Sequence, residues 1–152
     1  MKRIAVVRIR GCTGIRAELE DTLKMLKLTR INHCSIVDDR ATYLGMIHKC
    51  GDYITWGEID ESTFCDILLK RGRLPGDKPI TGELIKKAGF ASADDYAKKF
   101  MGGTAELEKL GMKEVFRLHA PRKGHKTIKK RYPAGALGDR GSAINELLKR
   151  MM

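Results

Sequence analysis

A run of cations near the C-terminal end is the feature of this sequence with the clearest chemical meaning. Residues 121–133 read PRKGHKTIKKRYP and contain no acidic residue. The glycine and the prolines oppose a helix, and the segment is too polar to bury itself. Its charge therefore requires an external counter-charge, which a phosphate backbone supplies while it releases condensed counterions. The Lys and Arg residues of this run are Arg122, Lys123, Lys126, Lys129, Lys130 and Arg131.

The side chains of the run offer several kinds of contact to a nucleic acid. An arginine can bind a phosphate with two hydrogen bonds, whereas a lysine acts as a point charge. Tyr132 can stack on an unpaired base, and His125 is a second candidate for stacking. The alternatives for the run are a solvated, disordered tail and, in a eukaryotic protein, a nuclear address.

The positive charge of the whole chain is concentrated in this region. The 152 residues carry a formal net charge of +11. Residues 111–152 contain eleven Lys or Arg and three acids, a balance of +8, which leaves +3 for residues 1–110. A small domain with this excess typically binds a polyanion. Nucleic acid fits better than a membrane surface, because the basic run lacks the broad apolar face of a membrane-binding helix.

The hydrophobic segments and the cysteines predict a cytosolic protein. No apolar run approaches the ~20 residues of a membrane span. Arg8 and Arg10 interrupt the apolar stretch at the start of the chain, which argues against a signal peptide. The four cysteines form no C-x-x-C pair, so we expect buried, inert thiols and neither a zinc site nor a disulfide.

Residues that could support catalysis have simpler structural explanations. The Gly11-x-x-Gly14 turn could hold a phosphate between Arg10 and Arg16. It matches neither a Walker loop nor a dinucleotide motif, so a tight turn is favoured. The pairs Asp38-Asp39 and Asp94-Asp95 each precede a predicted helix, which favours helix capping over magnesium binding or acid–base chemistry.

The elements that must position these residues follow from the hydrophobic periodicity. Residues 1–60 alternate between the period of a strand and the period of a helix, which predicts a β-α-β-α-β core of the α+β class. The strands are expected at residues 3–10, 33–37 and 53–59, and the helices at 15–28 and 40–50. The sequence fixes neither strand order nor strand direction.

The rest of the chain predicts two appendages to this core. Residues 61–110 contain short helical patterns around a Gly- and Pro-rich loop at 72–79, which indicates a helical insertion. Caps are expected at Thr81, Ser92 and Thr104, the last for a helix that ends near Leu110. Residues 111–152 predict a strand at 113–118, a long loop at 120–140 and a terminal helix capped by Ser142, all packing on the core.

Several longer stretches resemble a known family. The runs RIAVVRIRG, LKMLKLTRINHCSIVDD and YLGMIHKCGDYITWGEI resemble the ribosomal protein L-thirty family. The runs GRLPGDKPIT, VFRLHAPRKGHKTIKK and YPAGALGDRGSAINELLKRM resemble its archaeal and eukaryotic branch. The resemblance covers nearly the whole chain in order, and the modest length resembles the archaeal members.

The resemblance implies a ferredoxin-like core with a small, mainly antiparallel sheet. It implies a structural constituent of the large ribosomal subunit that binds ribosomal RNA beside neighbouring ribosomal proteins in the cytoplasm. It implies no catalysis, no cofactor, no metal and no small-molecule substrate. By position it implies RNA contacts from the basic run and from Arg8, Arg10, Arg16, Arg30, Arg71 and Arg73. Cys12 and Thr13 depart from the basic character expected in the first turn.

Two rival functions remain open at this point. A free-standing RNA-binding regulator or chaperone would require an exposed aromatic platform, and aromatic residues make up only 6% of the chain. An enzyme acting on a phosphate-bearing substrate at Gly11–Arg16 would require a neighbouring base or metal ligand, and the sequence offers no convincing set.

Overall fold

Strand β1 (Arg3–Arg8) lies at the centre of the molecule, buried along its whole length and paired on both edges. In the computed structural model, which describes all residues except 1, 106 and 108–110, the sheet has five strands in the order β4-β2-β1-β3-β5. Strands β2 (His33–Asp38) and β3 (Ile54–Glu58) flank β1 and run antiparallel to it. Strand β4 (Val115–Arg117) is antiparallel to β2, and β5 (Gly138–Asp139) is parallel to β3.

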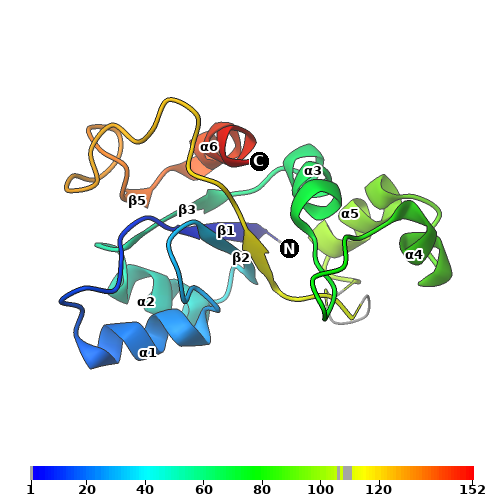
Figure 1. Ribbon diagram of the computed structural model, residues 1–152, viewed down its shortest axis with the longest axis horizontal. Coiled ribbons are helices and arrows are strands. Elements are labelled where there is room, and N and C mark those ends of the chain that lie inside the picture. Colours follow the sequence, from blue (N-terminus) through cyan, green and yellow to red (C-terminus); the bar gives the residue numbers. More distant parts are fainter. Residues whose placement is uncertain (1, 106, 108–110) are drawn as a thin grey trace.

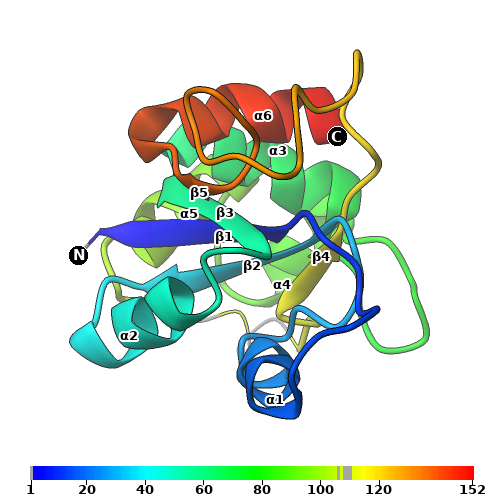
Figure 2. The ribbon, with the colours of Figure 1, turned by 90° about the vertical axis from the view of Figure 1, so that its left-hand side faces the viewer.

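The two faces of this mixed sheet are covered by different helices (Figures 1 and 2). Ile4 and Val6 point to the face covered by α1 (Ala17–Met25) and α2 (Ala41–Lys49). Ala5 and Val7 point to the opposite face, covered by α3 (Glu61–Arg71) and α6 (Ile144–Met151). Side chains alternate along a strand, so an apolar strand of this kind needs cover on both faces. The predicted β-α-β-α-β order of the first 60 residues is confirmed.

The last helix can reach the sheet only because residue 57 is a glycine. A Cβ at Gly57 would lie 2.1 Å from the carbonyl oxygen of Gly141 and 2.9 Å from Cβ of Ile144. Asn145 then ties the start of α6 to the end of β3: its amide nitrogen donates to the carbonyl of Glu58 at 3.0 Å, and its oxygen accepts from the Asp60 amide at 2.9 Å. The C-terminal segment is thereby packed on the same core as the N-terminal strands.

The insertion carries α4 (Gly82–Lys87) and α5 (Ala93–Met101) beyond the opposite edge of the core from the basic run (Figure 1). Helix α5 packs on α3 through Phe100 and Phe64, whose rings are stacked 4.4 Å apart. Arg3 joins this cluster to the sheet, because its Nε donates to the Phe100 carbonyl at 3.2 Å and its guanidinium lies 4.2 Å from the Phe100 ring. The insertion is therefore fixed to the start of β1.

The predicted helix caps have mixed outcomes. Ser92 caps α5 as predicted, since its Oγ accepts from the Asp95 amide at 3.1 Å. Thr81 is the residue before α4, but its side chain makes no capping hydrogen bond. Ser142 does not cap α6; it lies in a 3₁₀ turn (Gly141–Ala143) before that helix. Most of the helix predicted from Thr104 to Leu110 lies outside the described residues.

The prediction that Asp38 or Asp39 caps α2 is wrong. The residue before α2 is Arg40, and its side chain makes no capping hydrogen bond. Asp38 instead forms ion pairs with Arg3 and Arg40. The buried Arg3 guanidinium competes for the carboxylate, because a charge removed from water needs an opposite charge more than a helix end does.

Among the described residues, no helix combines the length and the apolar content required to cross a bilayer.

Gly57→Ala should destabilise the fold by about 2 kcal/mol or more, since the added methyl group must displace backbone in a packed region. Gly45→Ala is the matched control, because Gly45 lies inside α2 with no atom within 4 Å of the added Cβ. That change should leave the free energy of unfolding unchanged or raise it by about 0.5–1 kcal/mol. Urea unfolding measures both, and equal effects of the two changes would contradict the close approach of α6.

Candidate nucleic-acid interface

The strand directions separate positive from negative charge along the sheet. Because β1 is antiparallel to both neighbours, the end of β1 lies beside the beginnings of β2 and β3. We call this the cationic end, formed by residues 9–16, 29–32, 52–53 and 117–137. Its exposed or half-exposed cations include Arg10, Arg16, Arg30 and Arg117. The other end of the same strands carries more acids than cations: the acids are Asp38, Asp39, Glu58, Asp60 and Glu61, and the cations Lys2, Arg3 and Arg40 form ion pairs with Glu58 and Asp38.

Arg8 does not present its charge to the surface, and the prediction that it contacts RNA does not fit its placement. The residue is 1% exposed. Its guanidinium donates to the carbonyls of Arg10 at 2.9 Å and Leu28 at 2.7 Å. It also donates to the Gly11 carbonyl at 3.2 Å and to Sγ of Cys12 at 3.3 Å. Arg8 instead holds the turn after β1 against the segment that leads into β2.

Arg10 and Arg131, which lie 121 positions apart in the chain, come together at Asp52. Nη1 of Arg10 donates to the Asp52 carbonyl at 3.1 Å, and its guanidinium lies 5.1 Å from the Tyr53 ring. Nη2 of Arg131 lies 3.2 Å from a carboxylate oxygen of Asp52. This ion pair is exposed on both sides, so it contributes little stability. The contact does, however, bring the basic run to the cationic end of the sheet.

Among the described residues, Arg71 and Arg73 hydrogen-bond to other segments than the basic run. Arg71 donates to the carbonyl of Met152 at the end of α6. Arg73 pairs with Pro79 across the loop of the insertion, and its carbonyl accepts from the Lys113 amide at 3.0 Å. The resemblance grouped these arginines with the others by position, but neither is hydrogen-bonded to the basic run among the described residues.

The basic run has a fixed path because its backbone is hydrogen-bonded. The amides of Ala136, Leu137 and Gly135 donate to the carbonyls of Thr127, Lys130 and Arg131 at 2.8, 3.2 and 2.8 Å. Gly135 is required for this turn, since a Cβ there would lie 2.0 Å from the Lys130 carbonyl oxygen. Ala136 and Leu137 are buried, so the run is attached to the core by the residues that follow it.

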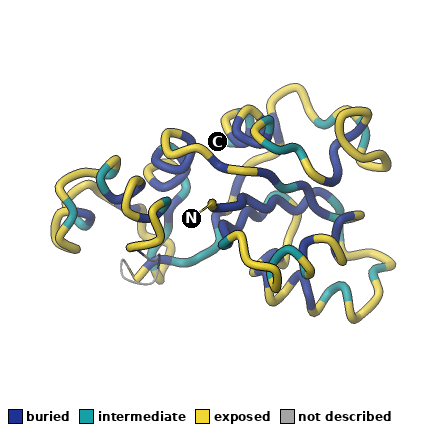
Figure 3. The backbone as a smooth tube through the Cα atoms, turned by 180° about the vertical axis from the view of Figure 1, so that it is seen from behind, coloured by how far each residue is buried: buried dark blue, intermediate teal, exposed yellow. Residues whose placement is uncertain are grey.

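The side chains of the run remain largely exposed. Figure 3 shows this segment exposed beyond the buried central strands. The exposed members are Arg122, Lys123, Lys126, Lys129, Lys130, Arg131 and Tyr132, whereas His125 is half-buried. The structure therefore combines an ordered backbone with an outward array of cations.

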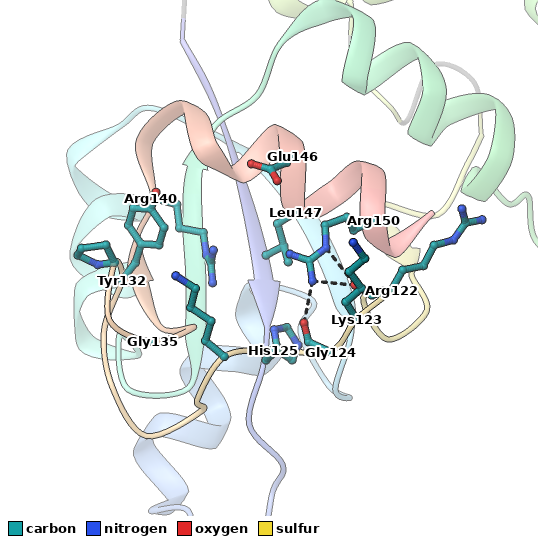
Figure 4. A pocket seen from close by; sticks show the side chains of 12 residues that line it. Arg122, Lys123, Gly124, His125, Tyr132, Gly135, Arg140, Glu146, Leu147 and Arg150 are labelled. Atoms are coloured by element: carbon teal, nitrogen blue, oxygen red, sulfur yellow. Dashed lines mark hydrogen bonds between the residues drawn. The ribbon is translucent and has the colours of Figure 1, made fainter.

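Between the run and α6 lies a hollow of about 530 Å³ (Figure 4). Its walls include Lys126, His125 and Tyr132 from the run. Arg140, before α6, and Arg150, within α6, complete it. The sequence analysis did not single out these last two arginines. In the sequence these two arginines are marked by their charge alone. Their position beside the run depends on the docking of α6, which the sequence does not show.

Neutral groups hold both of these arginines in place. Arg140 donates to Oγ1 of Thr55 and to the carbonyl of Ala136, each at 3.0 Å. Arg150 donates to the carbonyls of Arg122, at 2.7 and 3.0 Å, and Gly124, at 2.8 Å. Among the described residues, neither arginine lies within ion-pairing distance of a carboxylate. Their positions are held by hydrogen bonds while neither has a direct ion-pair partner, an arrangement suited to an anion.

The pKa of His125 reflects its burial and the nearby arginines of the hollow. Burial, with a smaller contribution from Arg140 and Arg150, lowers the pKa of His125 below its usual value of 6.5. Nδ1 of this ring is buried and has no hydrogen-bond partner within the part of the chain that the structure describes. Burial also lowers the pKa of Arg140. Both shifts disfavour positive charge in the unliganded hollow, and a bound anion would oppose them.

The remaining chemical candidates are structural. Burial raises the pKa of Cys34 to about 12 and that of Cys65 to about 11, and it also raises the pKa of Cys50. These thiols are inert as predicted, whereas Cys12 is exposed, contrary to the prediction. Among the described residues, no group of three or more His, Cys, Asp or Glu is arranged to hold a metal ion.

Comparison with known proteins identifies relatives along almost the entire chain. Residues 4–54 match the family model described as ribosomal protein L30p/L7e. The large ribosomal subunit protein uL30 of Methanococcus maripaludis is 47% identical over 97% of this chain and 98% of its own length. The proteins of the same name from Methanopyrus kandleri and Nanoarchaeum equitans are each 46% identical, over 95% and 99% of this chain and 100% and 99% of their own lengths.

If the hollow binds an anion, the pKa of His125 should rise when the anion binds. Binding is then coupled to proton uptake, so affinity should increase as the pH falls through the pKa that His125 has in the complex. An NMR titration of the His125 ring, with and without a short RNA, measures the shift directly. His125→Gln should flatten the pH dependence of binding. An unchanged His125 pKa in saturating RNA would show that the hollow is not the anion site.

Proposed function

The chain belongs to the ribosomal protein L30p/L7e family, and from this premise we infer that it is a structural constituent of the large ribosomal subunit. Relatives 46–47% identical along nearly their whole length carry the name of a large-subunit protein. The protein accordingly binds ribosomal RNA and neighbouring ribosomal proteins, works in translation in the cytoplasm, and is not an enzyme.

We propose that the cationic end of the sheet is the surface that meets the RNA. The observation that carries the proposal is the ordered basic run, whose exposed lysines and arginines have a single ion-pair partner, Asp52, among the described residues. Phosphate contacts neutralise these charges and release counterions. The proposed contacts are Arg10, Arg16, Arg30, Arg122, Lys123, His125, Lys126, Lys129, Lys130, Arg131 and Tyr132, with Arg140 and Arg150 in addition.

Most of these contacts would position the protein and would not read sequence. Lysine and arginine side chains that meet phosphates fix register and orientation but carry no base information. The rigid backbone of the run matters for that task, because an ordered array loses less conformational entropy on binding than a flexible tail. Arg71 and Arg73 are proposed as a separate and smaller contact on the insertion side.

The arrangement of β1, α1, β2, α2 and β3 also supports a ferredoxin-like core, which we propose as the common framework of the family. Both helices lie on one face of the sheet, and β1 lies between β2 and β3, antiparallel to each of them. In the same proposal, residues 61–110 are an insertion and residues 111–152 an extension that packs on the core. Strand β5 departs from a purely antiparallel sheet because it joins β3 in parallel.

The Gly11–Arg16 turn supports an enzyme poorly. Arg10 turns away toward Asp52, and the carbonyl of Gly11 and the thiol of Cys12 accept from Arg8. The turn is thus held by the protein itself. A free-standing RNA-binding regulator would use the same surface, so the distinction rests on the family and on where the protein is found in the cell.

Replacing Lys129 and Lys130 by alanine should weaken RNA binding and reduce its salt dependence. Each lost phosphate contact lowers the slope of log K against log salt concentration by about 0.7–0.9. The double variant should therefore lose about 1.5 from the slope. Binding of a fragment of large-subunit ribosomal RNA, measured between low and high salt, gives this value.

Lys86→Ala combined with Lys87→Ala is the matched control. It removes the same charge from exposed positions of α4, on the insertion side of the molecule. The control should retain a slope close to that of the unaltered protein, and both variants should unfold at the same urea concentration as that protein. Equal slopes for the two double variants would contradict the assignment of RNA binding to the basic run.

A further inference from the structure

The hollow between the basic run and α6 differs from the rest of the cationic end because it is concave and contains a ring. The double helix presents convex ridges of phosphate and keeps its bases stacked inside. Lysines on an open surface, such as Lys129 and Lys130, suit such ridges. A hollow with an aromatic wall suits a smaller ligand that enters it, and its volume of about 530 Å³ falls in the range of about 300–1,000 Å³ that is typical of ligand pockets.

The aromatic wall is Tyr132, which is 40% exposed and rests on Arg140. The Arg140 guanidinium lies 5.0 Å from the centre of the tyrosine ring. Arg140 is itself hydrogen-bonded to Thr55 and Ala136, so the ring is supported on the side that this guanidinium occupies (Figure 4). A flat ring supported in this way is a stacking platform, since every nucleobase offers a π-face.

The cationic wall lies across the hollow from this platform. Arg150 extends from α6 toward the start of the run, where carbonyls hold it, and Arg122 and Lys123 stand at the same rim (Figure 4). Lys126 and the half-buried His125 complete the lining. Among the described residues, none of the five lysines and arginines of the hollow has an ion-pair partner; the acid in its wall is Glu146. A phosphate in the hollow would meet five cations that are offset in its wall by the single carboxylate of Glu146.

We propose that this hollow binds one unstacked nucleotide of RNA, with its base on Tyr132 and its phosphate among Arg140, Arg150 and Lys126. The inference rests on the proposed RNA-binding function and deepens it, because it assigns to the extension a contact with an unpaired nucleotide. The target is therefore a loop, bulge or single-stranded junction of the RNA. The rest of the cationic end binds backbone phosphates around that point.

The other ligands that this chemistry admits lack part of the fit. An isolated phosphate would use the cations and leave the tyrosine platform unoccupied. An acidic peptide would satisfy the charge but has no feature that matches a flat, supported ring. Both are outcomes that the test below distinguishes from a nucleotide.

The first experiment uses the unaltered full-length protein and simple probes. Uridine, cytidine, adenosine and guanosine 5′-monophosphates are each titrated against it, with ribose 5-phosphate as the ligand that lacks a base. Base stacking should shift the NMR signals of the Tyr132 ring with every nucleotide and should shift them far less with ribose 5-phosphate. Equal shifts with and without the base, or tighter binding of a poly-glutamate peptide than of a nucleotide, would overturn the proposal.

The second experiment compares variants on two RNAs of equal length, a single strand and a perfect duplex. Tyr132→Leu should weaken binding of the single strand about tenfold, in line with the loss of one stacked base. It should leave duplex binding and the salt slope unchanged, while Tyr132→Phe should retain single-strand binding. Equal weakening on both RNAs by Tyr132→Leu, or no weakening on either, would contradict the nucleotide site.

The Lys129→Ala, Lys130→Ala double variant distinguishes the nucleotide site from the proposed RNA-binding function on which it rests. These lysines lie outside the lining of the hollow. The double variant should weaken both RNAs and should leave the Tyr132 response to nucleotides intact. If it weakens neither RNA, the basic run is not the RNA-binding surface and the proposed function fails, whatever Tyr132→Leu shows.

Discussion

The antiparallel pairing of β1 with both β2 and β3 determines where every charged loop of this molecule lies. A central strand that is buried on both faces and paired on both edges has only its two ends open to solvent. The loops before and after it must therefore gather at those ends. The loops at one end carry an excess of cations and those at the other an excess of carboxylates, two of which are paired with Lys2, Arg3 and Arg40. The cationic end is the one that we propose for a partner of negative charge.

Two buried arginines show how the ends of the sheet are held. Arg8 holds the cationic end together through the carbonyls of Arg10, Gly11 and Leu28. Arg3 holds the opposite end through Asp38 and the carbonyl of Phe100. A buried guanidinium needs several acceptors, and its five donors can join segments distant in sequence. Both arginines stabilise the frame that presents other cations, and Arg8 adds its own buried positive charge at the cationic end.

The docking of α6 converts a basic segment into a shaped surface. The glycine at position 57 lets the helix approach β3, and Arg150 of that helix then holds the carbonyls of Arg122 and Gly124. Across the hollow, Arg140 supports the ring of Tyr132. Two cations of the hollow, Arg140 and Arg150, are held by neutral acceptors, so their side chains lose conformational entropy before any RNA binds. Because these side chains are already ordered, a ligand binds with a smaller further loss of conformational entropy.

The sequence predicted the elements better than it predicted the contacts between them. The alternation of periods in residues 1–60 gives the strands and helices correctly, because burial on one or two faces leaves a local pattern. Strand β5 leaves no such pattern, because it has only two residues. It follows a loop whose shape depends on Gly135. Position within the resemblance marked Arg8 and Arg122 alike as RNA contacts, although one is buried against carbonyls and the other is exposed. Arg140 and Arg150 were missed because their role depends on a helix that docks on a distant strand.

The most direct test of the account is the reactivity of lysines in the free protein and in the intact large ribosomal subunit. Brief acetylation followed by mass spectrometry reports the accessibility of each lysine. The account predicts that Lys126, Lys129 and Lys130 react in the free protein and are protected in the subunit, and that ribonuclease treatment restores their reactivity. If these lysines react equally in the free and assembled protein, the RNA does not lie on the cationic end and the account is wrong.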